Sequence, residues 1–554
     1  MQLVAYGAQD VYLTGNPQIT FFKVVYRRHT NFSMEAVEQV YNGTGDFGRT
    51  VQATVNRNGD LITNMYALIQ LNASSSSNAD WGYVRRLGFA LIQETKIEIG
   101  GSKIDEQYGD WLNIWYELSH KVGQERGFAK MIGDVPELTD LNRSKSAYTM
   151  YVPLSYWFNR HTGLALPLIA LQYHDVRVTI QFRKLNELIN YQGNTAVAWT
   201  TQPAMQQSML LIDYIYLDSE ERKRFAQASH EYLIEQVQFT GSETLNNQSN
   251  KYRLNFNHPS KFLVWAPVWN DFQALSQGGS ANQYVAYTTN SVGTGGLVGT
   301  TWESARETFA KHVWLATRNG LTGSVANGWK VDVSDNLVDG SANIPVAGGL
   351  VTGPLSTLAN SISAEFVFQD ISSATSGTGI AVASPENVVL LNYEIVDASA
   401  MTTTVSDLLS GNTSVNSGLV ATYLRSVGIN VSDYFNYGLN IDGTNNFVAN
   451  AKLQLNGHDR FQERDGNYFN YVQPYQHFSN TPADGINVYS FALKPEEHQP
   501  SGTCNFSRID NATLNVTTLS NVTSSNGGDQ VNIYTVNYNV LRVMSGMAGT
   551  AYSN

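Results

Sequence analysis

Short runs of alternating apolar and polar residues are the feature of this sequence that most limits its fold. The clearest is Val176-Arg177-Val178-Thr179-Ile180-Gln181-Phe182, in which every second side chain is apolar. Because successive side chains of a strand point to opposite faces, this pattern predicts a β-strand with one buried face. Shorter runs of the same kind occur at Val51–Val55 and Ile97–Ile99, and Asn532–Val543 changes phase midway, which we interpret as a β-bulge.

The turn residues and the composition place these strands in sandwiches. Gly, Asn, Asp and Pro separate the runs, whereas a parallel sheet would alternate its strands with long amphipathic helices. Hydrophobic residues make up 42% of the chain and aromatic residues 11%, which is typical of a globular, β-rich protein. A length of 554 residues exceeds one sandwich, so two or three domains are expected.

One helix is predicted behind Asp110, which we interpret as its N-cap. Trp111, Trp115, Leu118 and Val122 fall on one face of this helix. We expect the helix to cover one end of a sandwich.

A second helix is predicted from about Ser219 to Glu231. Asp218 and Glu221 have the spacing of a capping box, and Glu220 precedes Arg224 by four residues, as an ion pair on a helix requires. We interpret this helix as a connector between two domains.

An internal repeat indicates that one sandwich is duplicated. Three short matches occur in the same order, the first of them 356 positions apart: Lys96–Gly101 with Lys452–Gly457, Asp110–Asn113 with Asn467–Asn470, and Glu38–Val40 with Glu235–Val237. A duplication is also the simplest explanation of the length.

The second copy carries a long insertion, between Asp271 and about Asn446. It is rich in Gly, Ser, Thr, Asn and Val, and it is too long for a bare loop. Glu365–Phe368 and Val388–Tyr393 have the composition of strands. We therefore expect the insertion to fold partly on itself and to project from the surface.

Charge and cysteine content exclude several classes of function. The formal net charge is −12 and no block of Lys and Arg stands out, so direct binding of nucleic acid is not expected. Cys504 is the only cysteine, which excludes an internal disulfide and a thiolate zinc cluster. Met1–Gly7 lacks the features of a signal peptide, and no apolar run is long enough to span a membrane. We expect a protein that is made in the cytoplasm and has no transmembrane segment.

One segment resembles nucleotide-binding motifs. Gly43-Thr44-Gly45-Asp46-Phe47-Gly48 fits GxGxxG and contains DFG. A dinucleotide-binding loop opens a helix, whereas the predicted strand Val51–Val55 follows here, and the other kinase motifs are missing. We interpret the segment as a turn.

No catalytic, cofactor-binding or metal-binding residue is predicted. His174-Asp175 and His458-Asp459 are interpreted as hydrogen-bonded surface pairs, and the acidic pairs Glu220-Glu221 and Glu496-Glu497 as solvated charges. Eleven N-x-[ST] sequons occur, and without a signal peptide most are expected to be unused. They include Asn412, Asn511, Asn515 and Asn521.

Two motifs resemble a known family. The N-terminal segment YLTGNPQITFFKVVYRRHTNF, Tyr12–Phe32, is similar to the opening of the major capsid proteins of large nucleocytoplasmic DNA viruses. DSEERKRFA, Asp218–Ala226, followed by HEYLIEQ, His230–Gln236, looks like the connector of that family into its second jelly roll.

The resemblance implies an all-β fold of two consecutive eight-stranded jelly-roll β-sandwiches, a double jelly roll, with short helices and a long loop insertion in the second. The expected parts are an N-terminal arm (1–32), a first jelly roll (33–217), a helical connector (218–231) and a second jelly roll (232–554) whose insertion (271–446) forms an outward tower. Such a chain forms homotrimeric, pseudo-hexagonal capsomers that tile an icosahedral virus shell. Its expected partners are copies of itself in the same and neighbouring capsomers, minor capsid and penton proteins, and glycans on the outer surface.

The candidate assembly residues lie in the N-terminal arm. They are the aromatic and basic residues that interface cores favour: Phe21, Phe22, Tyr26, Arg27, Arg28 and Phe32. The alternative is that these aromatic side chains pack on their own first sandwich.

Two other functions remain open at this point. A jelly-roll carbohydrate-binding protein or glycan-active enzyme would need a concave face with convergent acids. A spike or minor shell protein would share the fold but would not be expected to carry the connector motif.

Overall fold

The computed structural model describes ten segments of the chain. They are residues 7–78, 81–140, 142–191, 197–245, 247–268, 329–331, 337–339, 435–438, 446–519 and 529–552. Most of the expected insertion, including its strand-like pieces at 365–368 and 388–393, lies outside the described residues. Two short strands inside it pair with each other, β18 (Trp329–Val331) and β19 (Leu337–Asp339).

The first unit is a sandwich of two antiparallel sheets. One sheet has the order β1 (Phe32–Val40), β14 (Met205–Leu217), β3 (Leu61–Leu71), with β9 (Tyr148–Pro153) and β10 (Leu166–Pro167) on the far edge of β3. The other has the order β2 (Thr50–Thr54), β11 (Val176–Phe182), β6 (Ile92–Ile99), β7 (Ser102–Tyr108). Apolar side chains of both sheets form the core between them.

The second unit repeats this order. One sheet runs β15 (His230–Thr244), β26 (Gln530–Met544), β17 (Pro259–Val268), β23 (Asn487–Ser490), with β24 (Cys504–Asn505) beside β17 and β27 (Met547–Thr550) beside β26. The other runs β16 (Ser249–Arg253), β25 (Ala512–Thr518), β20 (Val448–Leu455), with β21 (His458–Asp459) and β22 (Arg464–Asp465) on its edge. Within the described segments these sheets hold more than the expected eight strands per sandwich, because several edge positions are divided between two short strands.

The repeats found in the sequence occupy equivalent places. Glu38–Val40 lies in β1 and Glu235–Val237 in β15, and each of these strands is the first in the order of its sheet, paired with β14 and β26 respectively. Lys96–Gly101 contains the end of β6 and Lys452–Gly457 the end of β20. The order of strands thus agrees with a duplicated sandwich.

Helices and small sheets fill the ends of the sandwiches. The helices are α1 (Val11–Thr14), α2 (Leu87–Leu91), α3 (Gly109–Ser119), α4 (Glu125–Ile132), α5 (Pro136–Thr139), α6 (Trp157–Arg160), α7 (Ser219–Gln227), a π-helix (Tyr468–Val472) that continues into α15 (Gln473–His477), and the 3-10 turns Thr162–Leu164, Leu168–Ala170, Leu185–Glu187 and Phe506–Arg508. The small sheets pair β12 (Ile189–Tyr191) with β5 (Trp81–Tyr83), and β4 (Ser74–Ser76) with both β13 (Trp199–Thr201) and β8 (Ser144–Lys145).

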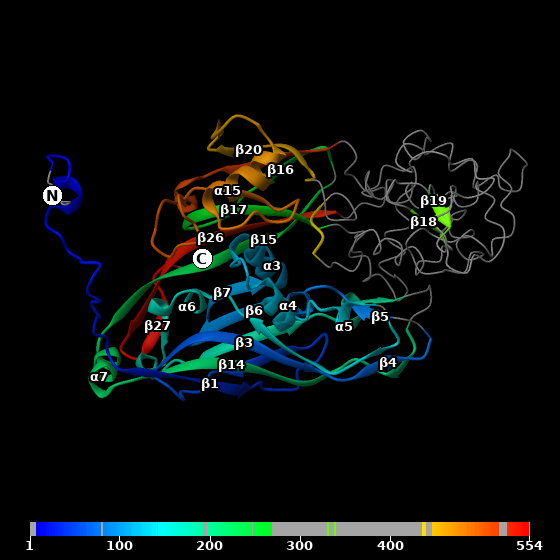
Figure 1. Cartoon of the computed structure of the whole chain (residues 1–554), viewed down its shortest axis with the longest axis horizontal. Helices are drawn as coiled ribbons and strands as arrows, with labels where there is room; N and C mark the ends of the chain where they lie inside the picture. Colours follow the sequence, from blue (N-terminus) through cyan, green and yellow to red (C-terminus); the bar gives the residue numbers. More distant parts are fainter. Residues whose placement is uncertain are drawn as a thin grey trace, which may run out of the picture.

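The layers lie in a simple sequence. Figure 1 shows the sheet of β1, β14 and β3 at the bottom of the view, followed upward by β6 and β7, by β15 and β26, and by the upper part of the second unit with β16 and β20. Helix α3 lies between the two sandwiches, and one cluster of buried hydrophobic side chains extends from the first sandwich across α3 to β17 and β26.

The strand predictions are confirmed, with one correction. β11 covers Val176–Phe182, as predicted, and its side chains alternate between buried and more exposed. The phase change in Asn532–Val543 is not a bulge of that strand. Between Phe239 and Ser242 the register shifts in β15, and between Ser260 and Phe262 it shifts in β17, while β26 runs on between them.

The prediction for α3 needs two corrections. The helix begins at Gly109, so Asp110 lies in its first turn and is not the N-cap. Gly109 is required there because a Cβ atom would lie 2.1 Å from the carbonyl oxygen of Ile92. The helix ends at Ser119, since His120 has an extended backbone, and Val122 is therefore exposed instead of continuing the apolar face.

The connector helix is shorter than predicted. α7 ends at Gln227 and β15 begins at His230. Asp218 is its N-cap, as predicted, and accepts hydrogen bonds from the amides of Glu220 and Glu221 at 3.0 Å. The carboxylate of Glu220 lies 3.7 Å from Nζ of Lys223 and not beside Arg224.

Candidate functional site

The N-terminal arm exposes its aromatic residues. Phe21 is 90% exposed, Phe22 98% and Tyr26 86%, whereas Phe32, at the start of β1, is 50% exposed. Figure 1 shows the arm passing α7 and leaving the body of the protein. The side chains of Phe21, Phe22 and Tyr26 therefore do not pack on their own first sandwich. Arg27 and Arg28 are exposed as well.

The second surface of interest is the junction between the two sandwiches, which is centred on α3. Trp111 is fully buried and its ring lies 6.2 Å from that of Phe262 and 5.5 Å from that of Tyr534. Trp115 stacks on Phe262 at 6.4 Å. The predicted apolar face of the helix thus packs on the second sandwich, where it covers the sheet formed by β15, β26 and β17.

A half-buried carboxylate beside these rings accepts hydrogen bonds from the second unit. Asp110 accepts from the hydroxyls of Tyr534 at 2.9 Å and Tyr437 at 2.5 Å, and from the amide of Asn532 at 3.2 Å. Tyr437 belongs to the described end of the insertion, so this end packs back against the first sandwich. Tyr437 and Tyr534 are buried and donate to this carboxylate, so the pKa values of their hydroxyls are raised, first by burial and then by the charge of Asp110.

An ion-pair cluster completes the junction. Glu235 of β15 lies 3.0 Å from Arg160 of α6, 2.8 Å from Lys261 and 3.5 Å from His498. Lys261 is only 1% exposed and Glu235 only 7%. Burial by itself would raise the pKa of Glu235, but the hydrogen bond from His498 and the charges of Arg160 and Lys261 outweigh burial and lower the pKa to about 2. The pKa of Lys261 is lowered because burial outweighs the attraction of Glu235.

A second buried acid lies close by, in β7. Asp105 accepts a hydrogen bond from the amide of Val237 at 3.0 Å and from the side chain of Gln107 at 3.0 Å. Burial nevertheless raises the pKa of Asp105 to about 7. The junction therefore contains two buried carboxyl groups whose pKa values are shifted in opposite directions. The pKa of Glu235 is lowered, and the pKa of Asp105 is raised.

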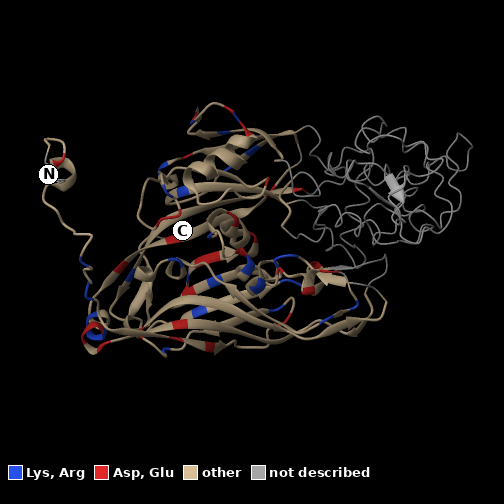
Figure 2. Cartoon of the chain, viewed as in Figure 1, with Lys and Arg blue, Asp and Glu red and all other residues tan. Residues whose placement is uncertain are grey.

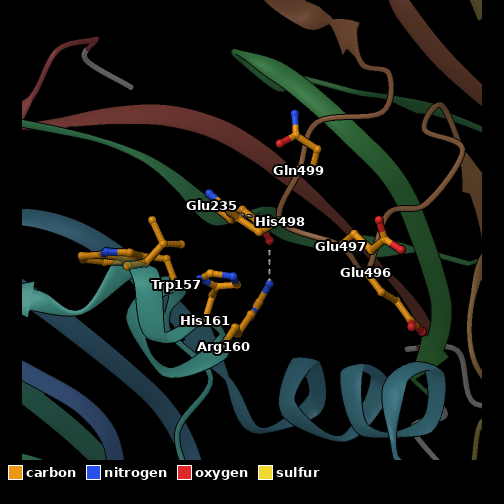
Figure 3. Close-up of a pocket in the computed structure, with 9 residues that line it drawn as sticks. Trp157, Arg160, His161, Glu235, Glu496, Glu497, His498 and Gln499 are labelled. Atoms are coloured by element: carbon orange, nitrogen blue, oxygen red, sulfur yellow. Dashed lines mark hydrogen bonds and ion pairs between the residues drawn. The ribbon is translucent and has the colours of Figure 1, made fainter. Parts of the chain in front are cut away.

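A pocket of about 500 Å³ opens beside this cluster. Figure 3 shows Arg160, His161, Glu235 and His498 pointing toward one another, with Glu496 and Glu497 farther along the wall. The carboxylate of Glu235 is held by cations, Glu497 pairs with Lys494 at 2.9 Å, and Glu496 accepts hydrogen bonds from the amide and the hydroxyl of Ser479. In the part of the chain that the structure describes, no three His, Cys, Asp or Glu residues are arranged to hold a metal ion.

The other motifs noted in the sequence lie apart from the junction. Gly43–Gly48 forms a loop before β2, and Asn42 bridges to Gln52. The two His-Asp pairs do not bond internally, contrary to expectation. Instead His174 contacts the backbone of Ala548, and Asp459 accepts from Gln454 and Lys452.

The remaining sequence observations are placed as follows. Cys504 is a half-buried free thiol, and burial raises its pKa. Of the four sequons named above, Asn511 and Asn515 fall in the described residues, and Asn412 and Asn521 lie outside them. Among the described helices, none is long and apolar enough to cross a membrane.

Sequence reasoning missed the ion-pair cluster. The repeat singled out Glu235, because it matches Glu38, but nothing in the local pattern indicates that Arg160 and Lys261 meet it. The burial of Asp105 could not be predicted, because its polar neighbours Glu106 and Gln107 are typical of a solvent-exposed segment.

The comparisons with known proteins cover the whole chain. A model of the major capsid protein N-terminus matches residues 20–218, and a model of the large eukaryotic DNA virus major capsid protein matches residues 221–305 and 357–549. The major capsid protein of Phaeocystis pouchetii virus is 42% identical, and capsid protein 1 of Acanthamoeba polyphaga mimivirus is 39% identical. Each alignment covers 100% of this chain and 99% of the relative.

Solved structures agree with the sequence comparison. The crystal structure of PBCV-1 VP54, fitted into a reconstruction of the virophage Sputnik, is 31% identical, with a TM-score of 0.58 over 97% of this chain and 100% of that one. The Faustovirus major capsid protein, at 12% identity, has a TM-score of 0.59 over 97% of this chain and 94% of that one, which shows the shared fold. The chain therefore belongs to the family of major capsid proteins of large eukaryotic DNA viruses, and it is a structural protein of the virion shell with a double jelly-roll fold.

Proposed function

We propose that three copies of this chain form a pseudo-hexagonal capsomer, and that such capsomers tile the faces of an icosahedral shell. The observation that carries the proposal is the pair of equivalent sandwiches, which lie side by side with the same strand order. Two similar units per chain give three chains six similar units, as a nearly hexagonal outline requires.

The proposed parts of the chain are those expected from the sequence: arm 1–32, first jelly roll 33–217, connector 218–231 and second jelly roll 232–554, with the insertion 271–446 as an outward tower. The start of β1 at Phe32 and of β15 at His230 supports two of these boundaries to within two residues.

The arm is proposed to bind neighbouring capsomers and the minor capsid and penton proteins. Phe21, Phe22 and Tyr26 are almost fully exposed, and an apolar segment of this kind marks a protein interaction site. Arg27 and Arg28 add the guanidinium groups that interface cores favour.

The capsid protein is further proposed to assemble in the host cytoplasm, to bind no nucleic acid directly and to catalyse no reaction. Figure 2 supports the second point, because Lys and Arg are interspersed with Asp and Glu over the described elements instead of forming a basic surface. The free thiol of Cys504 is compatible with a reducing compartment.

A glycan-binding function has less support. The pocket beside Glu235 contains one large aromatic side chain, Trp157, and this ring is only 2% exposed, so it offers no stacking surface to a sugar. Glycans on the outer surface of the shell remain a proposed partner class.

Electron microscopy of the purified full-length protein tests the capsomer. We expect three-fold particles with a pseudo-hexagonal outline, together with a sedimentation coefficient that corresponds to three chains. Monomers that persist at micromolar protein concentration would contradict the proposal.

A variant with Phe21→Ser, Phe22→Ser and Tyr26→Ser tests the arm. Supplied as a tagged copy in infected cells, it should still form trimers but enter virions about tenfold less than the wild type. Tyr173→Ser, which changes an aromatic residue that is 75% exposed on the body, is the matched control and should be incorporated normally. Normal incorporation of the triple variant would refute the role of the arm.

A further inference from the structure

The second sandwich carries another pocket, separate from the one beside Glu235. It measures about 460 Å³ and is called here the C-terminal pocket, because Tyr552 lines it. The rest of its wall comes from β15, from β26, from the start of β17 with His258 before it, and from the turn Phe506–Arg508 with Asn505 before it. Figure 1 shows β15, β17 and β26 side by side, so the pocket lies on this sheet.

The charge of the C-terminal pocket differs from that of the whole chain. The chain has 47 acidic and 35 basic residues. Among the described residues that line the pocket, none is acidic, whereas Arg508 carries a permanent positive charge. Within the described part of the chain, Arg508 also has no carboxylate partner. A positive site without an acid, on a protein that is acidic as a whole, favours a bound anion.

The polar side chains beside Arg508 have hydrogen-bond donors to spare. Oδ1 of Asn505 accepts from the amide of Ser507 at 3.1 Å, so the side-chain NH₂ group of Asn505 is left to donate. The hydroxyl of Ser507 accepts from the amide of His258 at 2.8 Å, which leaves its own proton to donate. Together with the guanidinium group, these donors suit an anion with several acceptor oxygens, such as a phosphate group.

A buried hydroxyl adds a further donor. Tyr538 lines the pocket and is 6% exposed, and its hydroxyl has no hydrogen-bond partner among the described residues. A buried polar group without a partner costs free energy, and such groups in a folded protein call for an explanation. A ligand that accepts from Tyr538 would remove this cost.

The turn that carries the donors is held firmly by the body of the protein. Phe506, between Asn505 and Ser507, is 3% exposed, and its ring lies 5.9 Å from that of Phe256. Its amide donates to the carbonyl oxygen of His258 at 3.1 Å. The donors are therefore in place before a ligand binds, which lowers the cost of binding.

Apolar side chains form the remaining wall. They are Leu233, Pro259 and Val540, with the ring of Tyr552, which is 61% exposed. The volume is in the range of pockets that bind small organic molecules, so an organic group has room beside the phosphate. The described lining has one arginine and no lysine, whereas a nucleic-acid backbone needs a line of basic residues.

We propose that the C-terminal pocket binds an organic phosphate. The phosphate group accepts from Arg508, Ser507 and Asn505, and the organic group lies against the apolar wall. The bound molecule joins the turn Phe506–Arg508 to Tyr552 near the end of the chain. A soluble phosphate ester and a phospholipid headgroup offer the same chemistry. The site is complete within one chain, so this inference goes beyond the proposed capsomer and does not depend on it.

Isothermal titration of the full-length protein with phenyl phosphate tests the proposal. Inorganic phosphate and phenol, the two halves of this probe, are titrated separately, and KCl keeps the ionic strength constant because salt screens charge. We expect phenyl phosphate to bind at least tenfold more tightly than either half. A phenyl phosphate that binds no more tightly than phenol would overturn the proposal.

Two substitutions and a control assign the binding to the pocket. Arg508→Gln should weaken the binding of phenyl phosphate at least tenfold, because it removes the charge-assisted hydrogen bonds. Arg253→Gln is the matched control, since Arg253 is an exposed arginine of β16 outside the pocket, and it should bind like the wild type. Equal losses in the two variants would overturn the proposal.

Tyr538→Phe separates binding from folding. It deletes only a hydroxyl that has no partner among the described residues, so the free variant should be at least as stable as the wild type in urea. Its affinity for phenyl phosphate should nevertheless fall about fivefold. Unchanged affinity would show that this hydroxyl does not contact the ligand and would overturn the proposed site.

Vesicles distinguish the two sources of the phosphate group. Phosphatidylcholine vesicles with and without phosphatidic acid are sedimented with the wild type and with Arg508→Gln. Binding that requires both phosphatidic acid and Arg508 supports the proposal with a phospholipid as the ligand. Binding of phenyl phosphate without binding of vesicles supports it with a soluble ester. Neither phenyl phosphate nor vesicles binding would overturn it and would leave the proposed capsomer standing.

Discussion

Arg160 of the first sandwich and Glu235 of the second form an ion pair, with Nη1 and Oε2 3.0 Å apart and side chains only 17% and 7% exposed. The guanidinium also lies 4.5 Å from the ring centre of Trp115, so one side chain joins the charged and the aromatic parts of the junction. The two sandwiches are therefore held together by a buried contact instead of by the connector alone.

We predict that Arg160→Ala destabilises the monomer by about 3 kcal/mol, because it removes one partner of a buried charge and uncovers Trp115. Lys261 remains beside Glu235 and limits the loss. Urea unfolding followed by tryptophan fluorescence measures the change. Arg57→Ala is the control, since Arg57 and Asp175 are 45% and 58% exposed, and it should cost less than about 1 kcal/mol. Equal effects of the two substitutions would contradict the importance of the junction pair.

Glu235 should also make stability depend on acid. Its pKa is lowered to about 2 in the folded protein, against about 4.3 in an unfolded chain. The stabilisation is therefore present above about pH 4.3 and is lost as the pH falls toward 2, by about 3 kcal/mol in all. Unfolding midpoints measured from pH 6 to pH 2 should show this decline.

The matched variant is Glu235→Gln, which should be less stable at pH 6 and should flatten the decline between pH 4 and 2. Glu220→Gln, a change at a side chain that is 88% exposed, should leave the curve unchanged. A wild-type curve that is flat over this range would show that the carboxylate is not held as the structure indicates.

A strand could be predicted from the sequence where the burial of its own two faces leaves a visible pattern of side chains. β11 was predicted over its full length because one of its faces is buried and the other is more exposed, so its side chains alternate visibly. The bulge predicted in β26 was wrong because Val531–Tyr538 is buried on both faces of the strand. A strand buried on both faces does not alternate apolar and polar side chains, so a change in this alternation does not indicate a bulge.

Contacts between distant parts of the chain could not be predicted. The apolar face of α3 was apparent, but the sequence does not show that the helix stops at Ser119, where the backbone of His120 becomes extended. The meeting of Arg160 with Glu235 depends on how two sandwiches pack, and no spacing within either segment encodes it. The arm residues were identified by resemblance and composition, and only the structure shows that their rings leave the first sandwich.

Asp105 should make the stability of the protein depend on pH in a different range from Glu235. Burial raises its pKa to about 7 in the folded protein, against about 3.9 in an unfolded chain. The folded state thus binds the proton of Asp105 more tightly than the unfolded chain does. The contribution of Asp105 to stability is therefore complete below about pH 3.9 and is lost as the pH rises through 7, at a cost of about 4 kcal/mol.

Asp105→Asn tests this effect, because an amide stays neutral and its oxygen can still accept from Val237. We expect the variant to be more stable than the wild type at pH 8 and to show a weaker pH dependence between pH 4 and 7. Glu98→Gln, on the neighbouring strand β6, serves as the control for a loss of charge. If the variant and the wild type have parallel stability curves, Asp105 does not change its protonation in this range.

Trp111 should contribute more to stability than any periodicity in the sequence indicates, because it fills the space between two sandwiches. We predict that Trp111→Ala destabilises the protein by about 4 kcal/mol, through loss of contacts with Phe262 and Tyr534 and the cavity left behind. Val122→Ala is the matched control. The sequence placed Val122 on the same helical face, but its side chain is 82% exposed, so the change should stay within about 0.5 kcal/mol. The free energies of unfolding of the two variants test this prediction. A large loss of stability in Val122→Ala would mean that α3 continues past Ser119.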